Sequence, residues 1–212
     1  MVTHILPGGL RYLTRSQPPG EVHLARLGTD YADLYLLHWR GEVPLEQTVE
    51  EMQRLWHSGR IKSWGVSNFD LADMEELAAL PHGNHVAANE DLYNLSSRGI
   101  EFELIGWQRS LDIPLIAYSP LRASGGERGA REMRTSPAVN KVAEAHQVTP
   151  SQVLLAWVIR NNGHTLAIPQ TSNEDHMRDN IAAANLTLTD DDLTLLDQAF
   201  PPPRHKVPLD IL

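Results

Sequence analysis

Residues Asp33 to Trp39 read DLYLLHW, an apolar run of strand length that ends in a histidine and a tryptophan. Leu34 to Leu37 contain no charged residue, which is typical of a strand that is buried on both faces of a parallel sheet. His38 then stands at the carboxyl end of this strand. In parallel α/β proteins ligands bind at that end, because the loops that leave the strands converge there. The stretch therefore predicts an α/β fold with a site around His38.

The composition favours a single domain that acts on a small molecule. The chain has 212 residues, 42% hydrophobic and 21% charged, which is enough to bury a core. It has no cysteine, which excludes disulfides and thiolate chemistry and is compatible with the cytoplasm, the location that we expect. The net charge of -9 disfavours nucleic-acid binding. We therefore expect no nucleic-acid partner. No stretch resembles a signal peptide or a spanning helix, so we expect no membrane partner either.

Strand and helix patterns alternate along the chain at steps of roughly 25 to 30 residues. Besides the opening stretch, the expected strands are Met1 to Pro7, Ile61 to Ser67, His85 to Asn89, Ile113 to Ser119 and Thr165 to Pro169. The expected helices are Glu21 to Leu27, Pro44 to Gly59, Asp70 to Leu80, Glu101 to Leu111, Pro137 to His146, Thr149 to Asn161, one through Ala184 and one capped by Thr189 to Asp192. Loops are expected at Gly8 to Gly20 and Ala123 to Gly129, and a proline-rich tail at residues 201–212.

This alternation indicates a parallel sheet with crossover helices, either closed as a barrel or open and doubly wound. No Gly-x-Gly-x-x-Gly motif follows a strand, which argues against the doubly wound dinucleotide-binding fold. We therefore expect a TIM-type (β/α)8 barrel in one domain of residues 1–212. The sequence offers only six strands where a closed barrel has eight. We expect an incomplete barrel of about six parallel strands, with a gap between Val2 to Leu6 and Thr165 to Pro169.

Polar side chains follow the strands at their carboxyl ends. They are His38 and Trp39, Ser67 and Asn68, Asn89 and Glu90, Tyr118 and Ser119, and Gln170 and Thr171. They show no metal-ligand spacing, and Ser119 lacks the Gly-x-Ser-x-Gly context of a nucleophile, so we expect neither a metal site nor acyl transfer. The set suits a polar organic ligand with a flat ring. We expect one shared pocket lined by His38, Ser67, Asn68, Glu90 and Tyr118.

Five stretches of the sequence resemble the aldo-keto reductase family in their order and spacing. They are GTDYADLYLLHW, RIKSWGVSNF, DLYNL, IPLIAYSPL, and IPQTS with RDN after it. The resemblance covers about residues 21 to 203. Members of that family are (β/α)8 barrels that bind NADPH, less often NADH, and reduce aldehydes and ketones. The resemblance therefore implies an NAD(P)H-dependent oxidoreductase that reduces a small-molecule carbonyl compound by hydride transfer.

The resemblance also assigns roles to residues of the first half of the chain. His38 matches the histidine that orients the substrate carbonyl, and Trp39 beside it is a candidate for substrate contact. Ser67 and Asn68 match the pair that hydrogen-bonds the nicotinamide carboxamide. Glu90 stands where the family usually has a glutamine, so it is a further candidate for cofactor binding.

Residues of the second half match the rest of the cofactor site. Tyr118 matches the ring that stacks on the nicotinamide, and Ser119 and Leu121 match the start of the loop over the pyrophosphate. The segment that holds the adenosine end contains Gln170, Thr171, Arg178 and Asn180. Gln170 and His176 stand where the family has a lysine and an arginine, and Arg178 is the nearest remaining cation. A 2′-phosphate then loses charge-assisted partners, so we expect at most a weak preference for NADP over NAD.

The resemblance is incomplete in the catalytic set, which in the family is an aspartate, a tyrosine acid, a lysine and the histidine. The first two lie on early βα units that this sequence does not match, and MVTHILP has His4 in the place of the lysine. His38 and His4 are therefore the catalytic candidates. A lost general acid typically costs about 10²–10⁴-fold in rate, so we expect slow reduction by this chain alone. Residual activity should rise as the pH falls through about 6.5, the ordinary pKa of a histidine such as His38.

Three hypotheses stay open at this point. The chain is a carbonyl reductase, or it is a non-catalytic nucleotide-binding or regulatory protein, or it is a partial barrel that acts only by assembly with another chain. The third hypothesis includes a homo-oligomer formed through the open barrel edge, because natural proteins cover or pair an exposed strand edge. Cofactor binding separates the third hypothesis from the others, and turnover separates the first two.

Overall fold

A computed structural model describes residues 2–5, 24, 28–122, 126–161 and 163–212 of the chain. The chain divides into two compact units, Met1–Glu90 and Asp91–Leu212, which we call the first and the second unit. The loop expected at Gly8 to Gly20 lies outside the described residues. So does the helix expected at Glu21 to Leu27, except for Leu24, which is helical.

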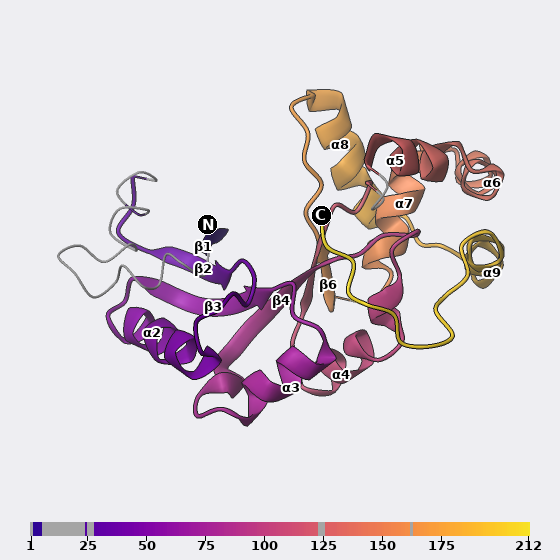
Figure 1. Cartoon of the computed structure of the whole chain (residues 1–212). Coiled ribbons are helices and arrows are strands. Elements are labelled where there is room, and N and C mark those ends of the chain that lie inside the picture. Colours follow the sequence, from indigo (N-terminus) through magenta and orange to yellow (C-terminus); the bar gives the residue numbers. More distant parts are fainter. Residues whose placement is uncertain (1, 6–23, 25–27, 123–125, 162) are drawn as a thin grey trace. The chain divides into compact units, whose positions relative to one another are not determined.

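The first unit is a parallel sheet with crossover helices (Figure 1). Its strands pair in the order β1 (Val2–Ile5), β2 (Ala32–Leu37), β3 (Ile61–Ser67) and β4 (Val86–Leu92), and β4 ends in the second unit. Helix α2 (Leu45–His57) connects β2 to β3. Helix α3 (Leu71–Ala79), with the 3-10 turn η2 (Gly83–His85) after it, connects β3 to β4. Parallel neighbours require such crossovers, since a tight hairpin joins only antiparallel strands.

The sequence explains where these helices lie and where they end. Helix α2 buries Leu45, Val49 and Met52, which recur at helical spacing on one face. Gly59 follows the helix with φ +74°, a conformation that glycine adopts without strain. Helix α3 begins at a capping box, in which the Asp70 carboxylate accepts from the backbone N–H at position 73 at 3.0 Å. The core of the unit then forms where these apolar faces meet the sheet.

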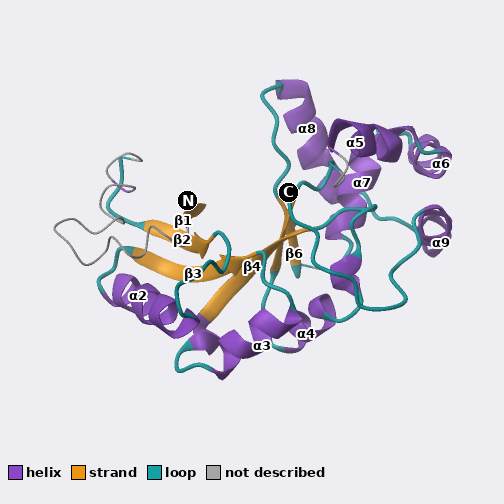
Figure 2. Ribbon diagram, in the orientation of Figure 1, coloured by secondary structure: helices purple, strands orange, loops and turns teal. Residues whose placement is uncertain are grey.

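The second unit contains two further parallel strands and most of the helices (Figure 2). Strand β5 (Leu115–Tyr118) pairs in parallel with β6 (Thr165–Ala167). The helices are α4 (Leu104–Ser110), α5 (Gly126–Thr135), α6 (Pro137–His146), α7 (Pro150–Ile159), α8 (Glu174–Ala182) and α9 (Asp190–Ala199), with 3-10 turns η3 (Gly99–Glu101) and η4 (Ala183–Asn185). Residues 201–212 form neither helix nor strand, and Lys206 in this tail pairs with Glu103 at 3.0 Å.

A network of charged side chains ties together distant parts of the second unit. Glu101 accepts from Arg98 at 2.7 Å, from Arg160 at 2.9 Å and from the hydroxyl of Tyr93 at 2.5 Å. Arg160 also lies over the indole ring of Trp157, with its guanidinium 3.8 Å from the ring centroid. Because these groups are largely buried, the two arginines compensate the Glu101 carboxylate and satisfy its hydrogen-bonding capacity.

Most elements expected from the sequence are confirmed, including an α/β fold with six parallel strands. The caps expected at Thr149 with Gln152 and at Thr189 with Asp192 form capping boxes at the starts of α7 and α9. Helix α6 has the expected bounds, Pro137–His146. The gap expected between the first and last strands stays a prediction.

Two expectations about helix bounds are wrong. The loop expected at Ala123 to Gly129 gives way at Gly126 to helix α5, which continues to Thr135. The glycines suggested a loop, but Glu127 to Arg134 contain charged and apolar residues with helical spacing. The helix expected at Glu101 to Leu111 begins only at Leu104, because residues 99–101 form a 3-10 turn.

Candidate functional site

The carboxyl ends of the first unit's strands bring several of the candidate residues together. The strands are parallel, and at this end Ile5 pairs with Leu37 and Ser67 pairs with Glu90, after a register shift between Trp64 and Val66. Residues that end or follow these strands therefore lie along one edge of the sheet. His38 and Asn68 follow β2 and β3, His4 is the last residue but one of β1, and Glu90 in β4 pairs with Ser67, the last residue of β3. We call His4, His38, Asn68 and Glu90 the strand-end cluster.

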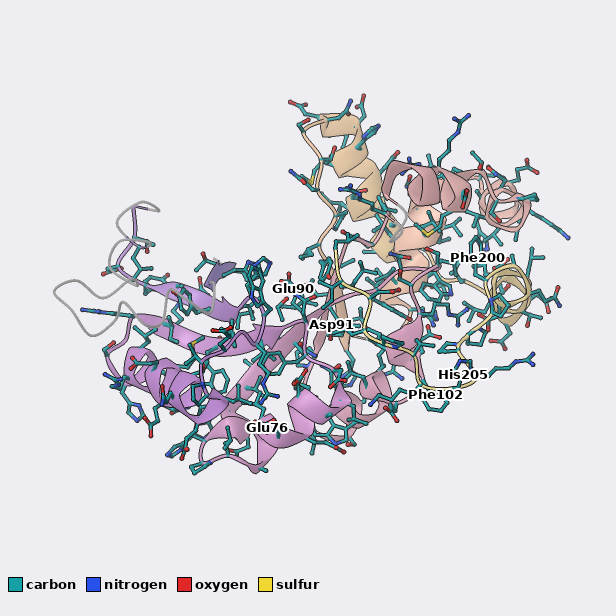
Figure 3. All side chains as sticks on the ribbon, in the orientation of Figure 1. Glu76, Glu90, Asp91, Phe102, Phe200 and His205 are labelled. Atoms are coloured by element: carbon teal, nitrogen blue, oxygen red, sulfur yellow. The ribbon has the colours of Figure 1, made fainter. Side chains whose placement is uncertain are left out.

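The two histidines and the glutamate of this cluster are in contact. His4 Nε2 lies 3.0 Å from Glu90 Oε2, and the Glu90 side chain, labelled in Figure 3, is only 6% exposed. The rings of His4 and His38 have centroids 5.1 Å apart, and the ring of His38 lies 4.7 Å from that of Trp39. His4, which replaces the lysine expected from the resemblance, thus lies between the carboxylate and the second imidazole.

Asn68 fixes the backbone around this cluster. Its side-chain amide donates to the carbonyl oxygen of His38 at 2.9 Å, and its backbone N–H donates to that of Glu90, also at 2.9 Å. The Ser67 hydroxyl donates to the Glu90 carbonyl oxygen as well, at 2.8 Å. Asn68 has φ +59°, a left-handed conformation that asparagine tolerates better than most residues. Because Asp70 caps α3, neither Ser67 nor Asn68 serves as the N-cap.

The surroundings of His38 favour its neutral form. Burial lowers the pKa of His38 below its ordinary value of 6.5, and the charge of His4 lowers it further, while the Glu90 carboxylate opposes both effects. At neutral pH the imidazole of His38 is therefore mostly uncharged and able to donate one hydrogen bond.

The buried tyrosines near these strands have unfavourable pKa values for a proton donor. Burial raises the pKa of Tyr35 to about 12. Burial also raises the pKa of Tyr93, whose hydroxyl is engaged by Glu101 and Arg160. A general acid works best when its pKa lies near the working pH.

The second unit holds a cavity of about 810 Å³, which we call the loop cavity. Its lining includes five of the residues assigned to cofactor binding: Ser119, Leu121, Gln170, Thr171 and Asn180. It also includes residues that the sequence analysis did not assign to cofactor binding: Pro120, Arg122, Arg134, Thr149, Ser151, Ile168, Pro169, His176 and Asp179. Residues from the β5 loop and from the segment between β6 and α8 thus meet around one space.

A buried asparagine shapes the β5 side of this cavity. The amide of Asn94 donates to the carbonyl oxygens of Ser119 at 3.1 Å and Arg122 at 2.9 Å. Its own oxygen accepts from the backbone N–H groups of Ser96 and Ser97. Asn94 belongs to the DLYNL stretch but received no role from the sequence. Asn94 lies two residues after β4 and is fully buried, so its amide needs several partners.

Side-chain hydrogen bonds also hold the segment that leads into α8. Thr171 Oγ1 accepts from the backbone N–H of Asn173 at 3.1 Å. The oxygen of the Asn173 side chain in turn accepts from the N–H groups of residues 175 and 176, at 2.8 and 3.2 Å, and caps the helix. This arrangement fixes Gln170 and Thr171 beside the start of α8.

The cations of the loop cavity differ from those expected. Arg178 is exposed on α8 and is not among the residues that line the cavity. Arg122 and Arg134 line it instead, and Arg134 comes from α5, the helix that the sequence analysis missed. Arg122 and Arg134 thus place two guanidinium groups at a cavity where they could bind an anion.

The other predictions about site residues stay predictions. Tyr118 ends β5 and is half-buried, and its backbone carbonyl accepts from the N–H of Tyr93 at 3.5 Å. Its place in one pocket with His38, Ser67, Asn68 and Glu90 is a prediction. Within the ranges that the structure describes, no three histidine, aspartate or glutamate side chains are placed to hold a metal ion. No helix in those ranges is long and apolar enough to cross a membrane.

Comparison with known proteins gives a consistent family assignment. The model of the aldo/keto reductase family matches residues 19–200. Over 192 residues the chain is 45% identical to methylglyoxal reductase YeaE from Escherichia coli (strain K12), an alignment that covers 91% of this chain. The chain spans 66% of the length of that relative.

Solved structures agree with this assignment. An aldo/keto reductase from Klebsiella pneumoniae, crystallised with NADP and acetate, is 40% identical with a TM-score of 0.92, over 100% of this chain and 74% of that one. The thermostable aldo-keto reductase Tm1743, crystallised with the inhibitor epalrestat, is 33% identical with a TM-score of 0.80, over 93% of this chain and 70% of that one.

Proposed function

The chain belongs to the aldo/keto reductase family, and from this premise we propose that it binds NAD(P)H and serves in the reduction of a small aldehyde or ketone. The observation that carries the proposal is the loop cavity. Five residues that the resemblance assigned to the cofactor, from two distant parts of the sequence, line this one space. The name of the relative YeaE makes methylglyoxal the first substrate to test.

The residues of the loop cavity fit part of a dinucleotide. Its volume of about 810 Å³ lies within the usual range of ligand sites, about 300–1,000 Å³. Arg122 and Arg134 offer charge-assisted hydrogen bonds to phosphate oxygens, and the hydroxyl of Ser151 adds a neutral donor. When bound, NAD(P)H supplies the hydride for carbonyl reduction.

The strand-end cluster would hold the carbonyl group. A neutral His38 donates one hydrogen bond to the carbonyl oxygen and so orients it. The cation form of His38 would also be able to deliver a proton to that oxygen, but its lowered pKa makes this form scarce at neutral pH.

We further propose that the 212-residue polypeptide by itself reduces carbonyl compounds slowly. His4 replaces the lysine of the family, and none of the five tyrosines matches the tyrosine acid in context. A missing general acid costs about 10²–10⁴-fold. A cytoplasmic location, from the same sequence analysis, also remains a prediction.

NADPH oxidation in the presence of methylglyoxal tests the proposed function. We expect slow turnover that requires both the aldehyde and the protein. Tight NADPH binding without any turnover would favour the second hypothesis, a nucleotide-binding protein that does not catalyse. Absence of both binding and turnover would contradict the proposal.

Exposed apolar side chains on β6 and α8 support the remaining hypothesis, assembly with another copy of the chain. Leu166 is 58% exposed on β6 and Ile181 is 65% exposed on α8. Large exposed apolar groups at a strand edge are typical of a surface that pairs. Light scattering over a concentration series tests this, and a Leu166→Lys variant should shift any dimer towards monomer.

A further inference from the structure

The strand-end cluster joins side chains from strands that are not neighbours in the sheet. His4 lies on β1 and Glu90 lies on β4, with β2 and β3 between them. In a flat sheet, three spacings of roughly 4.8 Å would hold these two strands about 14 Å apart. The Nε2 atom of His4 and the Oε2 atom of Glu90 are nevertheless 3.0 Å apart. The two side chains therefore meet on the concave face of a strongly curved sheet.

Gly65 in β3 permits this curvature. A β-carbon at Gly65 would lie 2.5 Å from the carbonyl oxygen of Ala88 and 2.7 Å from the side chain of Leu36. Both distances are shorter than ordinary van der Waals contacts, so only glycine fits at this position. The side chain of β2 and the backbone of β4 thus close over β3, and the residues at the strand ends converge.

The carboxylate of the cluster is buried, whereas its two imidazoles are partly exposed. The side chain of Glu90 is 6% exposed and that of His4 is 34% exposed. His38 is also partly exposed, and the ring of Trp39 beside it is largely open to solvent. Glu90 therefore contacts His4 from the buried side, while both imidazoles remain accessible to a small molecule.

The hydrogen bond to Glu90 determines which nitrogen of a neutral His4 carries the proton. A carboxylate only accepts hydrogen bonds, so Nε2 of His4 donates and Nδ1 carries the lone pair. When Nδ1 accepts a proton, the imidazolium that forms is paired with the Glu90 carboxylate, and this charge-assisted hydrogen bond stabilises the cation. His4 thus has the features of a general base that a carboxylate positions.

His38 supplies a neutral hydrogen-bond donor beside this base. Burial lowers the pKa of His38 and the charge of His4 lowers it further, so His38 stays neutral next to a charged His4. The ring centroids are 5.1 Å apart, which allows both imidazoles to contact one small molecule. A base beside a neutral imidazole suits removal of a proton next to a carbonyl group, because the imidazole N–H contacts the oxygen that becomes negative.

We propose that the strand-end cluster catalyses the enolisation of a small ketone or aldehyde without a cofactor, and that His4 is the base. Nδ1 of His4 takes the proton from the carbon next to the carbonyl group. The electron pair of the broken C–H bond forms the C=C bond of the enolate, and the carbonyl π pair moves to the oxygen that His38 contacts. Return of a proton from His4 to the same carbon restores the substrate, so no oxidant or reductant is needed.

Exchange of hydrogen for deuterium in hydroxyacetone tests this activity. The compound is incubated with the whole chain in buffered deuterium oxide without NADPH, and proton NMR follows the loss of signal from the carbons next to the carbonyl group. We expect exchange about 10²-fold faster than in buffer alone. No acceleration over buffer overturns the proposal. The proposal shares only the role of His38 with the proposed function, and absence of NADPH-dependent turnover overturns the proposed function alone.

Two variants distinguish a base from a histidine with a structural role. His4→Gln should slow the exchange about 10²-fold, because an amide does not take up the proton. Glu90→Gln should slow it about tenfold, since the hydrogen bond to a charged group is lost. Glu90→Gln should also shift the nitrogen-15 NMR signals of the His4 imidazole, because the proton is no longer fixed on Nε2. This second variant decides the question if His4→Gln does not fold.

His146→Gln provides the matched control. Nε2 of His146 lies 2.8 Å from Oδ2 of Asp192 in the second unit, so this is another histidine paired with a carboxylate. Exchange should be unchanged in this variant. Exchange that survives His4→Gln, an equal loss in His146→Gln, or a Glu90→Gln variant with unchanged exchange and unchanged imidazole signals overturns the proposal.

Discussion

The two units hold their candidate residues in different ways. In the first unit the strand-end cluster follows directly from the register of the sheet, and its histidines and glutamate contact one another. In the second unit the loop cavity combines a loop, a helix and a strand end that are far apart in sequence. The comparison teaches that strand ends place candidate residues close together along the sheet, whereas a cavity built from distant segments also contains residues, such as Arg134, that the sequence analysis did not assign.

The two units also differ in how they hold arginine. Arg98 in the second unit is 6% exposed and binds Glu101 and Asp197, whereas Arg40 in the first unit is 37% exposed and binds Asp73 and Glu76. Each arginine therefore has two carboxylate partners but a different degree of contact with water.

The largest expected effect tests this difference between Arg98 and Arg40 directly. Arg98→Met should lower the free energy of unfolding by about 3 kcal/mol, because it breaks the buried pair with Glu101 and leaves Arg160 to compensate that carboxylate. Arg40→Met should cost about 1 kcal/mol or less, since water screens exposed pairs. Urea unfolding of both variants provides the measurement. Equal losses would show that burial does not set the strength of these pairs.

The next effect concerns the strand-end cluster. His38→Ala should remove the residual carbonyl reduction, a loss of about 10²-fold or more at acidic pH if His38 delivers the proton. In the wild type the rate should rise as the pH falls below 6.5, not through 6.5 itself, because burial holds the folded-state pKa of His38 lower. A pH profile of NADPH oxidation for both proteins checks this. A rate that is independent of pH and survives His38→Ala would point to another acid.

The lowered pKa of His38 also makes the free energy of unfolding depend on pH. Below pH 6.5 the unfolded chain protonates His38 more readily than the folded chain does, so this group's contribution to stability is lost as the pH falls. In His38→Gln the free energy of unfolding should depend less on pH in this range. Unfolding at a series of pH values measures the difference, and identical pH dependence in both proteins would refute the account.

A smaller effect is expected on NADPH affinity when the β5 side of the loop cavity is changed. Asn94→Ala removes two hydrogen bonds that shape the β5 loop, to Ser119 and Arg122. NADPH affinity should then fall about tenfold, or roughly 1.4 kcal/mol. The variant Asn84→Ala, at an exposed position in η2 of the first unit, serves as the control. Calorimetric titration compares the two, and an unchanged affinity in Asn94→Ala would show that the loop keeps its shape without that amide.

The smallest expected effect concerns cofactor choice. Gln170 and His176 both line the cavity, in place of the lysine and arginine that the resemblance led us to expect. We therefore expect NADPH to bind at most about tenfold more tightly than NADH, a difference of roughly 1.4 kcal/mol. Parallel titrations measure the ratio. A larger ratio would mean that Arg122 or Arg134 recognises the additional phosphate.

Much of the fold and part of the site were readable from the sequence, for physical reasons. Apolar runs and caps such as Thr149 with Gln152 depend on neighbours within a few residues, so their elements were expected correctly. His38 was proposed as a site residue because it follows a strand end, and its role stays a prediction. Arg134 was missed because glycines suggested a loop where α5 begins. Asn94 was missed because its role depends on carbonyl oxygens more than twenty residues away, which no local pattern reveals.

The central claim is that the loop cavity holds the nucleotide, and a fluorescence titration of NADPH tests it most directly. Arg134 lines the cavity, whereas Arg131 lies on the same helix outside the lining, so Arg134→Gln and Arg131→Gln form a matched pair. We expect saturable binding that is about tenfold weaker in Arg134→Gln and unchanged in Arg131→Gln. Absence of NADPH binding, or the same affinity in both variants, would contradict the claim.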